Sequence, residues 1–101
     1  MGTQIMNNQL DTLESMVYAK NLDLDLFYDI SIQKRSIKLL GHCTKENIEQ
    51  CERAIGGKLI PYEEHFNNGW LKGEIIFEIP VRKETYFYDT SIITFVLTPE
   101  D

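Results

Sequence analysis

Three closely spaced aspartates come nearest, in this sequence, to a pattern that could support catalysis. Asp23, Asp25 and Asp29 fall on one side of an alternating segment, and two carboxylates two residues apart can share a hard cation such as Mg²⁺. Glu74 and Glu78 would add ligands if their strand lay beside the aspartates, as in a metal-dependent phosphodiester or nucleotide enzyme. Because the sequence has no glycine-rich phosphate loop, we favour a solvated acidic sheet face, without a metal, a cofactor or a catalytic residue.

The cysteines and histidines, Cys43, Cys51, His42 and His65, are the other residues with chemistry of their own. Zinc ligands usually come in tightly spaced pairs, whereas the two cysteines are eight residues apart. Cys51 falls on the apolar side of an expected helix, which favours a buried structural thiol. Cys43 precedes that helix, so a nucleophile with a lowered pKa, assisted by a histidine, is the alternative.

The segment from Tyr62 to Trp70 is the most unusual loop, because it combines three aromatic residues with two acids, a histidine and flexible Asn and Gly. Tyr and Trp are favoured contact residues at interfaces, so one interpretation is a recognition loop. The alternative is that the aromatic residues plug an end of the sheet while the polar residues are solvated. The candidate binding residues of this loop and of the acidic strands are Tyr62, Glu63, Glu64, His65, Phe66, Trp70, Asp23, Asp25, Asp29, Glu74 and Glu78.

Two long strands are expected near the C-terminus, and the first carries the candidate residues Trp70, Glu74 and Glu78. Residues 70–79 alternate, with Leu71 and Ile75 on the apolar side and Lys72 and Glu74 on the polar side. Residues 85–98 are rich in β-branched and aromatic residues, which suit a pleated surface. We expect Pro80 to weaken the first strand, residues 81–84 to form a polar connection, and residues 89–91 to form a bulge or a break.

Two amphipathic helices and a hairpin are expected upstream. Apolar steps of three and four predict one helix from residue 7 or 8 to about residue 19, and another from a Thr44 cap to about residue 55. Residues 22–32 and 36–42 alternate and predict a hairpin, and residues 59–60 a short strand. The residues expected to point inward from the first hairpin strand are Leu22, Leu24, Leu26, Tyr28, Ile30 and Ile32.

The expected fold is therefore α+β. It is a two-layer sandwich in which an antiparallel sheet of four or five strands, in the order α-β-β-α-(β)-β-β, carries two helices on one face. We expect residues 1–101 to form a single domain, with 1–6 and 99–101 as flexible termini and Met6 as an alternative start. The opposite face would carry the acids.

Apolar residues on that opposite face predict that something covers it. Phe27 and Ile76 would lie there, and the consecutive aromatic residues 86–88 place an aromatic on both faces of their strand. A second copy of the chain is the simplest cover, which predicts a homodimer. Scattered surface apolar residues are the alternative.

Charge narrows the class of partner. The chain carries 16 acids and 10 bases, a net charge of −6, so phosphate backbones repel it and nucleic-acid binding is disfavoured. A protein with a basic surface is a better fit, although residues 33–58 carry six bases against three acids. No apolar run reaches membrane-span length, and the polar N-terminus shows no signal peptide. With two thiols and no CxxC spacing, we expect a cytoplasmic location.

The leading hypothesis is a small acidic interaction module that binds and occludes another protein. In general type it resembles small accessory proteins of phages and mobile elements, such as inhibitors of host defence and immunity proteins, although no motif carries that resemblance. One alternative is a protein that binds or sequesters a small molecule in a pocket at a dimer interface. The other is a metal-dependent enzyme that uses the three aspartates.

Overall fold

The computed structural model describes residues 11, 13–15, 17–33, 36–63, 69–82 and 87–100, with the side chains of all but 77–82 and 87–89. It confirms an α+β fold, in which a five-stranded sheet has the order β1-β2-β5-β4-β3. Residues 11, 13–15 and 17–20 are helical, and Asn21 ends that helix with a left-handed φ of 56°. The other elements are η1 (Leu24–Leu26), β1 (Phe27–Ile32), β2 (Ser36–His42), α2 (Lys45–Ile55), β3 (Ile60–Pro61), β4 (Leu71–Arg82) and β5 (Phe87–Thr98).

Strand direction differs from the expected antiparallel sheet at one pair. The pairs β1–β2, β3–β4 and β4–β5 are antiparallel, whereas β2 and β5 run parallel from Ser36↔Ile92 to His42↔Thr98. Short turns dictate antiparallel neighbours. The chain between β2 and β5 instead passes through α2, β3 and β4, so no turn sets the relative direction of these two strands.

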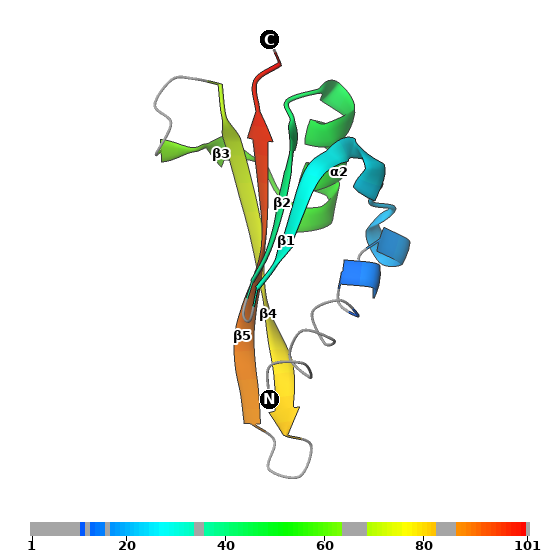
Figure 1. Cartoon of the computed structure of the whole chain (residues 1–101), viewed down its shortest axis with the longest axis vertical. Helices are drawn as coiled ribbons and strands as arrows, with labels where there is room; N and C mark the ends of the chain where they lie inside the picture. The colour runs from blue at the N-terminus through cyan, green and yellow to red at the C-terminus, as the bar shows by residue number, and fades with distance from the viewer. Residues whose placement is uncertain are drawn as a thin grey trace.

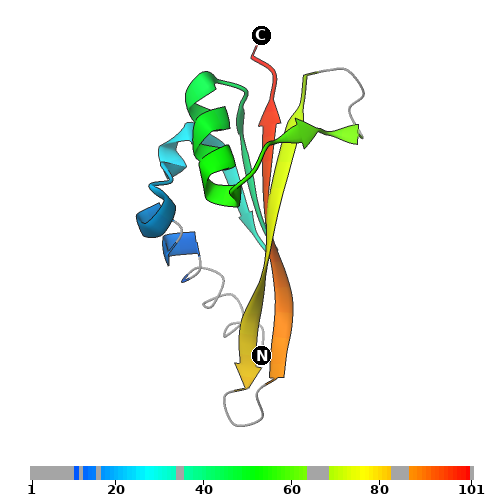
Figure 2. The same cartoon turned by 180° about the vertical axis from the view of Figure 1, so that it is seen from behind.

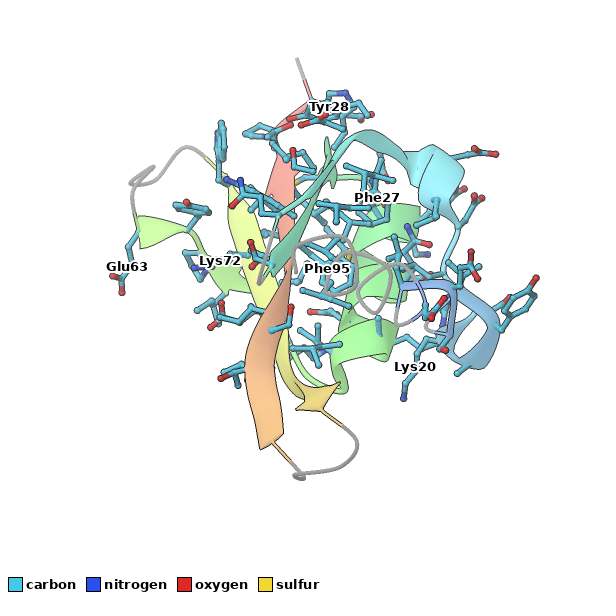
Figure 3. All side chains as sticks on the ribbon, turned by 60° about the horizontal axis from the view of Figure 1, so that its bottom comes forward. Lys20, Phe27, Tyr28, Glu63, Lys72 and Phe95 are labelled. Atoms are coloured by element: carbon cyan, nitrogen blue, oxygen red, sulfur yellow. The ribbon has the colours of Figure 1, made fainter. Side chains whose placement is uncertain are left out.

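The first strand begins later than the alternation predicts. Asp23 caps η1, because its carboxylate accepts a hydrogen bond from the Asp25 backbone N–H, and the strand starts only at Phe27. A bulge between Phe27 and Asp29 then reverses the expected sides of Phe27 and Tyr28 alone, because Ile30 and Ile32 pair with the buried Leu39 and Ile37 and so keep the predicted core side. Phe27 is buried, with its ring centroid 6.0 Å from that of Phe95, whereas Tyr28 points outward and is 54% exposed (Figure 3).

The two long strands form a continuous hairpin without the expected break at residues 89–91. Ile79 pairs with Asp89 and Phe77 with Ser91 in one unbroken register, and the irregularity lies instead between Pro80 and Arg82. The irregularity therefore falls in the strand that contains Pro80 and not at residues 89–91. Since β2 pairs with β5 only from Ile92 onward, β4 and β5 continue beyond the rest of the sheet as a two-stranded ribbon (Figures 1 and 2).

Both helices pack on one face of the sheet, as expected. Figures 1 and 2 show α2 on one side of the sheet, with the helical residues 17–20 beside it. The core contains Leu13 of the first helix, Cys51 and Ala54 of α2, and inward residues of the sheet. The fully buried sheet residues of this core are Ile37, Leu39, Ile93, Phe95 and Leu97, all on the side predicted from the alternation.

A buried amide network joins α2 to the sheet. The Asn47 side chain, 2% exposed, donates from Nδ2 to the carbonyl oxygens of Leu26 (2.8 Å) and His42 (3.0 Å). Gln50 donates to Asn47 Oδ1 at 2.8 Å and accepts from the Asp23 backbone N–H at 2.8 Å. The network therefore ties backbone groups at the entry to β1 to those at the end of β2, where the His42 carbonyl also accepts from the Thr44 N–H at 2.8 Å.

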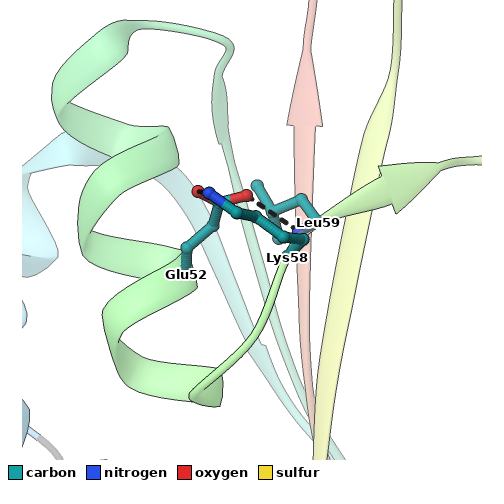
Figure 4. A network of polar contacts seen from close by, with 3 residues as sticks. All are labelled: Glu52, Lys58 and Leu59. Carbon is teal, nitrogen blue, oxygen red and sulfur yellow. Dashed lines mark hydrogen bonds and ion pairs between the residues drawn. The ribbon is translucent and has the colours of Figure 1, made fainter.

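A second contact fixes the chain that leaves α2. The Glu52 carboxylate accepts a hydrogen bond from the Leu59 backbone N–H at 3.0 Å, and its other oxygen lies 3.6 Å from Lys58 Nζ (Figure 4). Lys58 is largely exposed, so the ion pair contributes little. The bond to Leu59 directs the chain from α2 into β3.

Replacing Asn47 with leucine should lower the free energy of unfolding by about 2–4 kcal/mol. Two backbone carbonyls and the Gln50 amide would lose a partner, and a buried unsatisfied polar group costs roughly 1–3 kcal/mol. Urea denaturation followed by circular dichroism measures the change. Glu49→Leu on the exposed side of α2 is the matched control, and equal stability of the two variants would contradict this role for Asn47.

Candidate functional site

The face of the sheet opposite α2 carries the described aromatic and charged side chains best placed for a contact. Phe95 and Leu97 point into the core, so Thr94 and Val96 between them point to this second surface, which we call the open face; Thr94 is half-buried there, and Val96 is covered, with 1% of its surface exposed. Strand register places further residues in rows with them across the sheet. One row contains Asp29, Leu40, Val96 and Lys72, and the next contains Ser31, Lys38, Thr94 and Glu74.

At the β4 side of the open face, Lys72 is held against an aromatic pair. The Tyr62 backbone N–H donates to the Trp70 carbonyl at 3.0 Å, and the two rings meet edge to face with centroids 6.2 Å apart. Lys72 Nζ lies 5.4 Å from the centroid of the Tyr62 ring and 3.9 Å from a Glu74 carboxylate oxygen. Figure 3 shows Lys72 beside this edge of the sheet. These contacts limit the rotamers of the group before any partner binds.

At the β1 side of the open face, Tyr28 packs on His42. Their ring centroids are 4.9 Å apart, and His42 Nδ1 lies 3.4 Å from the Thr98 hydroxyl. That hydroxyl also donates to the Gly41 carbonyl at 3.3 Å, so it lies between the end of β2 and the His42 ring. Tyr28 is exposed, so both its ring face and its hydroxyl are available for contact.

The acids predicted to share one face do not do so. Asp23 and Asp25 lie in the η1 turn, and of the five acids so predicted, Asp29 and Glu74 are the two whose described side chains lie on the open face. Those two lie on strands separated by β2 and β5, roughly 14 Å apart at the usual strand spacing. Within the described ranges no three His, Cys, Asp or Glu residues are grouped to hold a metal ion. The geometry required for the metal-dependent enzyme is therefore not met by the described acids.

The predicted recognition loop is only partly described. Tyr62 and Trp70 at its two ends are half-buried and contact each other, and Glu63 is exposed. Glu64, His65 and Phe66 lie outside the described residues, as does the side chain of Glu78. The structure thus brings the aromatic ends of the loop together beside Lys72.

Sequence reasoning missed Tyr28 and Lys72 as candidates, and it considered His42 only for metal or cysteine chemistry. Strict alternation placed Tyr28 in the core, because the bulge that moves it outward has no glycine to mark it. Lys72 was read only as part of the polar side of its strand. Its position two residues after Trp70 is the one signal that could have identified it, since residues i and i+2 of a strand share a face.

Both cysteines are shielded, which disfavours the nucleophile. Burial raises the pKa of the Cys51 thiol from 9.0 to about 12, with the nearby Glu52 charge adding to the effect. Burial is also the main cause of the raised pKa of Cys43; a hydrogen bond with the Leu71 backbone opposes it, and Glu100 adds to it. The Cys43 thiol lies 3.3 Å from the Gly69 carbonyl oxygen, to which it donates. Neither thiol therefore has the lowered pKa that a nucleophile requires.

A shallow hollow lies beside the open face, at the edge of the sheet where β3 meets β4. It measures about 190 Å³ and is lined by Ile55, Lys58, Ile60, Lys72, Gly73 and Glu74. Pockets that enclose drug-sized ligands are typically about 300–1,000 Å³. This hollow therefore suits one side chain of a partner better than a free small molecule.

The chain matches no family model, no curated protein and no solved structure with which it was compared. Among the residues that the structure describes, no helix is long and apolar enough to cross a membrane. Any function must therefore be argued from the geometry of the chain itself.

Both thiols should react slowly with a thiolate-selective alkylating reagent at neutral pH. The raised pKa values keep them protonated, and the neutral thiol is a poor nucleophile. The stabilisation from burying a neutral Cys51 is complete below pH 9.0 and is lost as the pH rises toward about 12. Alkylation followed by mass spectrometry, with urea-unfolded protein as the reference, measures the protection. A native Cys43 that reacts faster than the unfolded thiol would restore the nucleophile hypothesis.

Proposed function

We propose that this protein is a non-catalytic interaction module that binds and occludes another protein through its open face. The observation that carries the proposal is the asymmetry of the sheet. Both helices pack on one side, while Tyr28, Lys72 and the Tyr62–Trp70 pair gather on or beside the other. Aromatic residues dominate binding energy at interfaces, and no described helix covers these.

The Lys72 group is the proposed anchor of the contact. Tyr62 and Trp70 present large ring surfaces at low cost in conformational entropy, because each is already held by the other. Burial under a partner would strengthen the attraction between Lys72 and the Tyr62 ring, since desolvated cation–π contacts are stronger than exposed ones. The exposed Tyr28 would make a second, peripheral contact.

Charge favours a partner with a basic surface, although the open face itself is mixed. Asp29 and Glu74 lie on it together with Lys38 and Lys72, so local contacts require both signs on the partner. The net charge of −6 acts at longer range and would speed encounter with a positive surface. Association rates should consequently fall as salt is added.

Sequestration of a small molecule is the second candidate, and the hollow beside β4 is what favours it. A second copy of the chain packed at that edge would deepen the hollow into a pocket at a dimer interface. A native mass spectrum of freshly purified protein separates the candidates. Extra mass of ligand size per subunit would favour sequestration, whereas bare protein would favour the interaction module.

A photoreactive phenylalanine placed at Tyr28 should cross-link the partner in cells, whereas the same residue at Tyr18 should not. Both tyrosines are exposed, at 54% and 87%, so accessibility alone does not favour Tyr28. Tyr18 lies on the first helix, away from the open face. Gel shift and mass spectrometry of the adducts measure the contact.

Specificity of that adduct is tested with a third variant. Adding Trp70→Ala to the Tyr28 probe should reduce the adduct about fivefold or more, because interface anchors cost upward of about 1 kcal/mol when truncated. Circular dichroism must show that the double variant remains folded. Adducts of the same partner from Tyr18 alone would reject the open face as the binding surface.

A further inference from the structure

Over most of the length of β4, no strand that the structure describes pairs with its outer edge. β3 pairs with β4 only at Ile60↔Lys72 and Pro61↔Leu71. From Gly73 to Arg82, no described strand lies on that side of β4, and its described partner there is β5 alone. An edge of this length is a template for another strand.

The backbone N–H and C=O groups of successive residues point to opposite sides of a strand, and this alternation shows which groups of β4 point to the free edge. The Trp70 carbonyl accepts from Tyr62, so the backbone of Trp70 points away from β5. Direction alternates along a strand, hence the backbone N–H and C=O of Glu74, Ile76 and Glu78 point to the same free edge. The backbone of Pro80 points to the free edge as well, which suits proline because the N–H that it lacks is not needed for pairing with β5.

Two further features favour a strand as the missing neighbour. Ile76 and Ile60, both beside this edge, are 61% and 60% exposed. The distal parts of β4 and β5 form a two-stranded ribbon, a structure that is only marginally stable without a third strand (Figure 1). A strand added at β4 would supply backbone hydrogen bonds and place a side chain of its own beside Ile76.

We propose that the neighbour is β4 of a second copy, paired antiparallel so that the two sheets become one. Length supports this choice. β3 blocks the edge at Lys72 and β4 ends at Arg82, so the available stretch is 73–81. Two such stretches overlap fully in antiparallel order only when Phe77 of one copy faces Phe77 of the other.

Charge selects the same register. With Phe77 at the two-fold axis, Glu78 faces Ile76 of the second copy and Glu74 faces Pro80, so no like charges are opposed. Shifting the axis to Ile76 opposes Glu74 with Glu78 twice, and shifting it to Glu78 opposes two copies of that residue. Like charges directly opposite one another destabilise a sheet.

Backbone pairing is also compatible with the Phe77 axis. Ile76 and Glu78 would exchange hydrogen bonds in both directions, because both point their backbone groups to the edge. The Glu74 N–H would donate to the Pro80 carbonyl of the second copy. This pairing needs no hydrogen bond from Pro80, which has no N–H. The inference does not rest on the proposed function, and it would join the two open faces into one surface.

Ile76→Pro tests the pairing. The substitution removes an N–H that points to the free edge, and Pro80 shows that β4 tolerates a proline whose backbone points to that edge. Light scattering after size-exclusion chromatography should give twice the 11.8 kDa chain mass for the wild type and the single-chain mass for the variant. Ile76→Thr keeps the N–H and should remain dimeric. A monomeric wild type, or a dimeric Ile76→Pro variant, would overturn the proposal.

Cysteine pairing tests the register and remains decisive if the proline variant fails to fold. Residues that face each other across a non-hydrogen-bonded antiparallel pair have Cα atoms about 4.5 Å apart, within disulfide range. Phe77→Cys should therefore form an intermolecular disulfide on mild oxidation, whereas Ile79→Cys, which faces Ile75, should not. Non-reducing electrophoresis measures the fraction of disulfide-linked dimer in each of the two variants. A dimer that cross-links at Ile79 or at neither position would overturn the Phe77 register.

Discussion

The rest of the structure depends on the buried amide network of Asn47 and Gln50. These two side chains form hydrogen bonds with backbone groups of Asp23 and Leu26 around η1 and of His42 at the end of β2, two segments that are well separated in the chain. A buried polar group satisfied in only one geometry allows little variation in packing, so α2 is held at a single height on the sheet. The close packing is visible at Gly41, where a Cβ atom would lie 2.7 Å from Asn47 Nδ2.

That network also explains why the two faces of the sheet differ. With α2 fixed on one side, Leu39 and Phe95 are fully buried beneath it, and the opposite side retains a mixture of aromatic, charged and aliphatic residues. The Phe27–Asp29 bulge follows from the same constraint, because Leu26 must present its carbonyl to Asn47 while Phe27 turns into the core. Tyr28 is thereby moved outward. A core requirement has thus placed an exposed aromatic residue on the open face.

The sequence predicted the parts of the fold that local periodicity controls. The Thr44 cap, the Gly56 end of α2 and the inward side of β5 were all read correctly, since each depends on a capping residue or an alternation a few residues long. The parallel β2–β5 pair could not be predicted, and neither could the distance across the sheet between Asp29 and Glu74, because both depend on strand order. The same distinction applies to the candidate residues. Tyr62 and Trp70 were identified because their residue types are favoured at interfaces, whereas identifying Tyr28 requires knowledge of the bulge and identifying Lys72 requires knowledge of the strand register.

The parallel pairing of β2 with β5 has a consequence for how quickly the chain folds. His42 and Thr98 are 56 residues apart in sequence, yet they are neighbours in the sheet. The β1–β2 and β4–β5 hairpins need only short loops to close, whereas joining them must first order the long segment that contains α2. Contacts of such separation slow folding. The two hairpins would therefore form before this late pairing step, and until it occurs the edge of β5 that pairs with β2 remains open to mispairing.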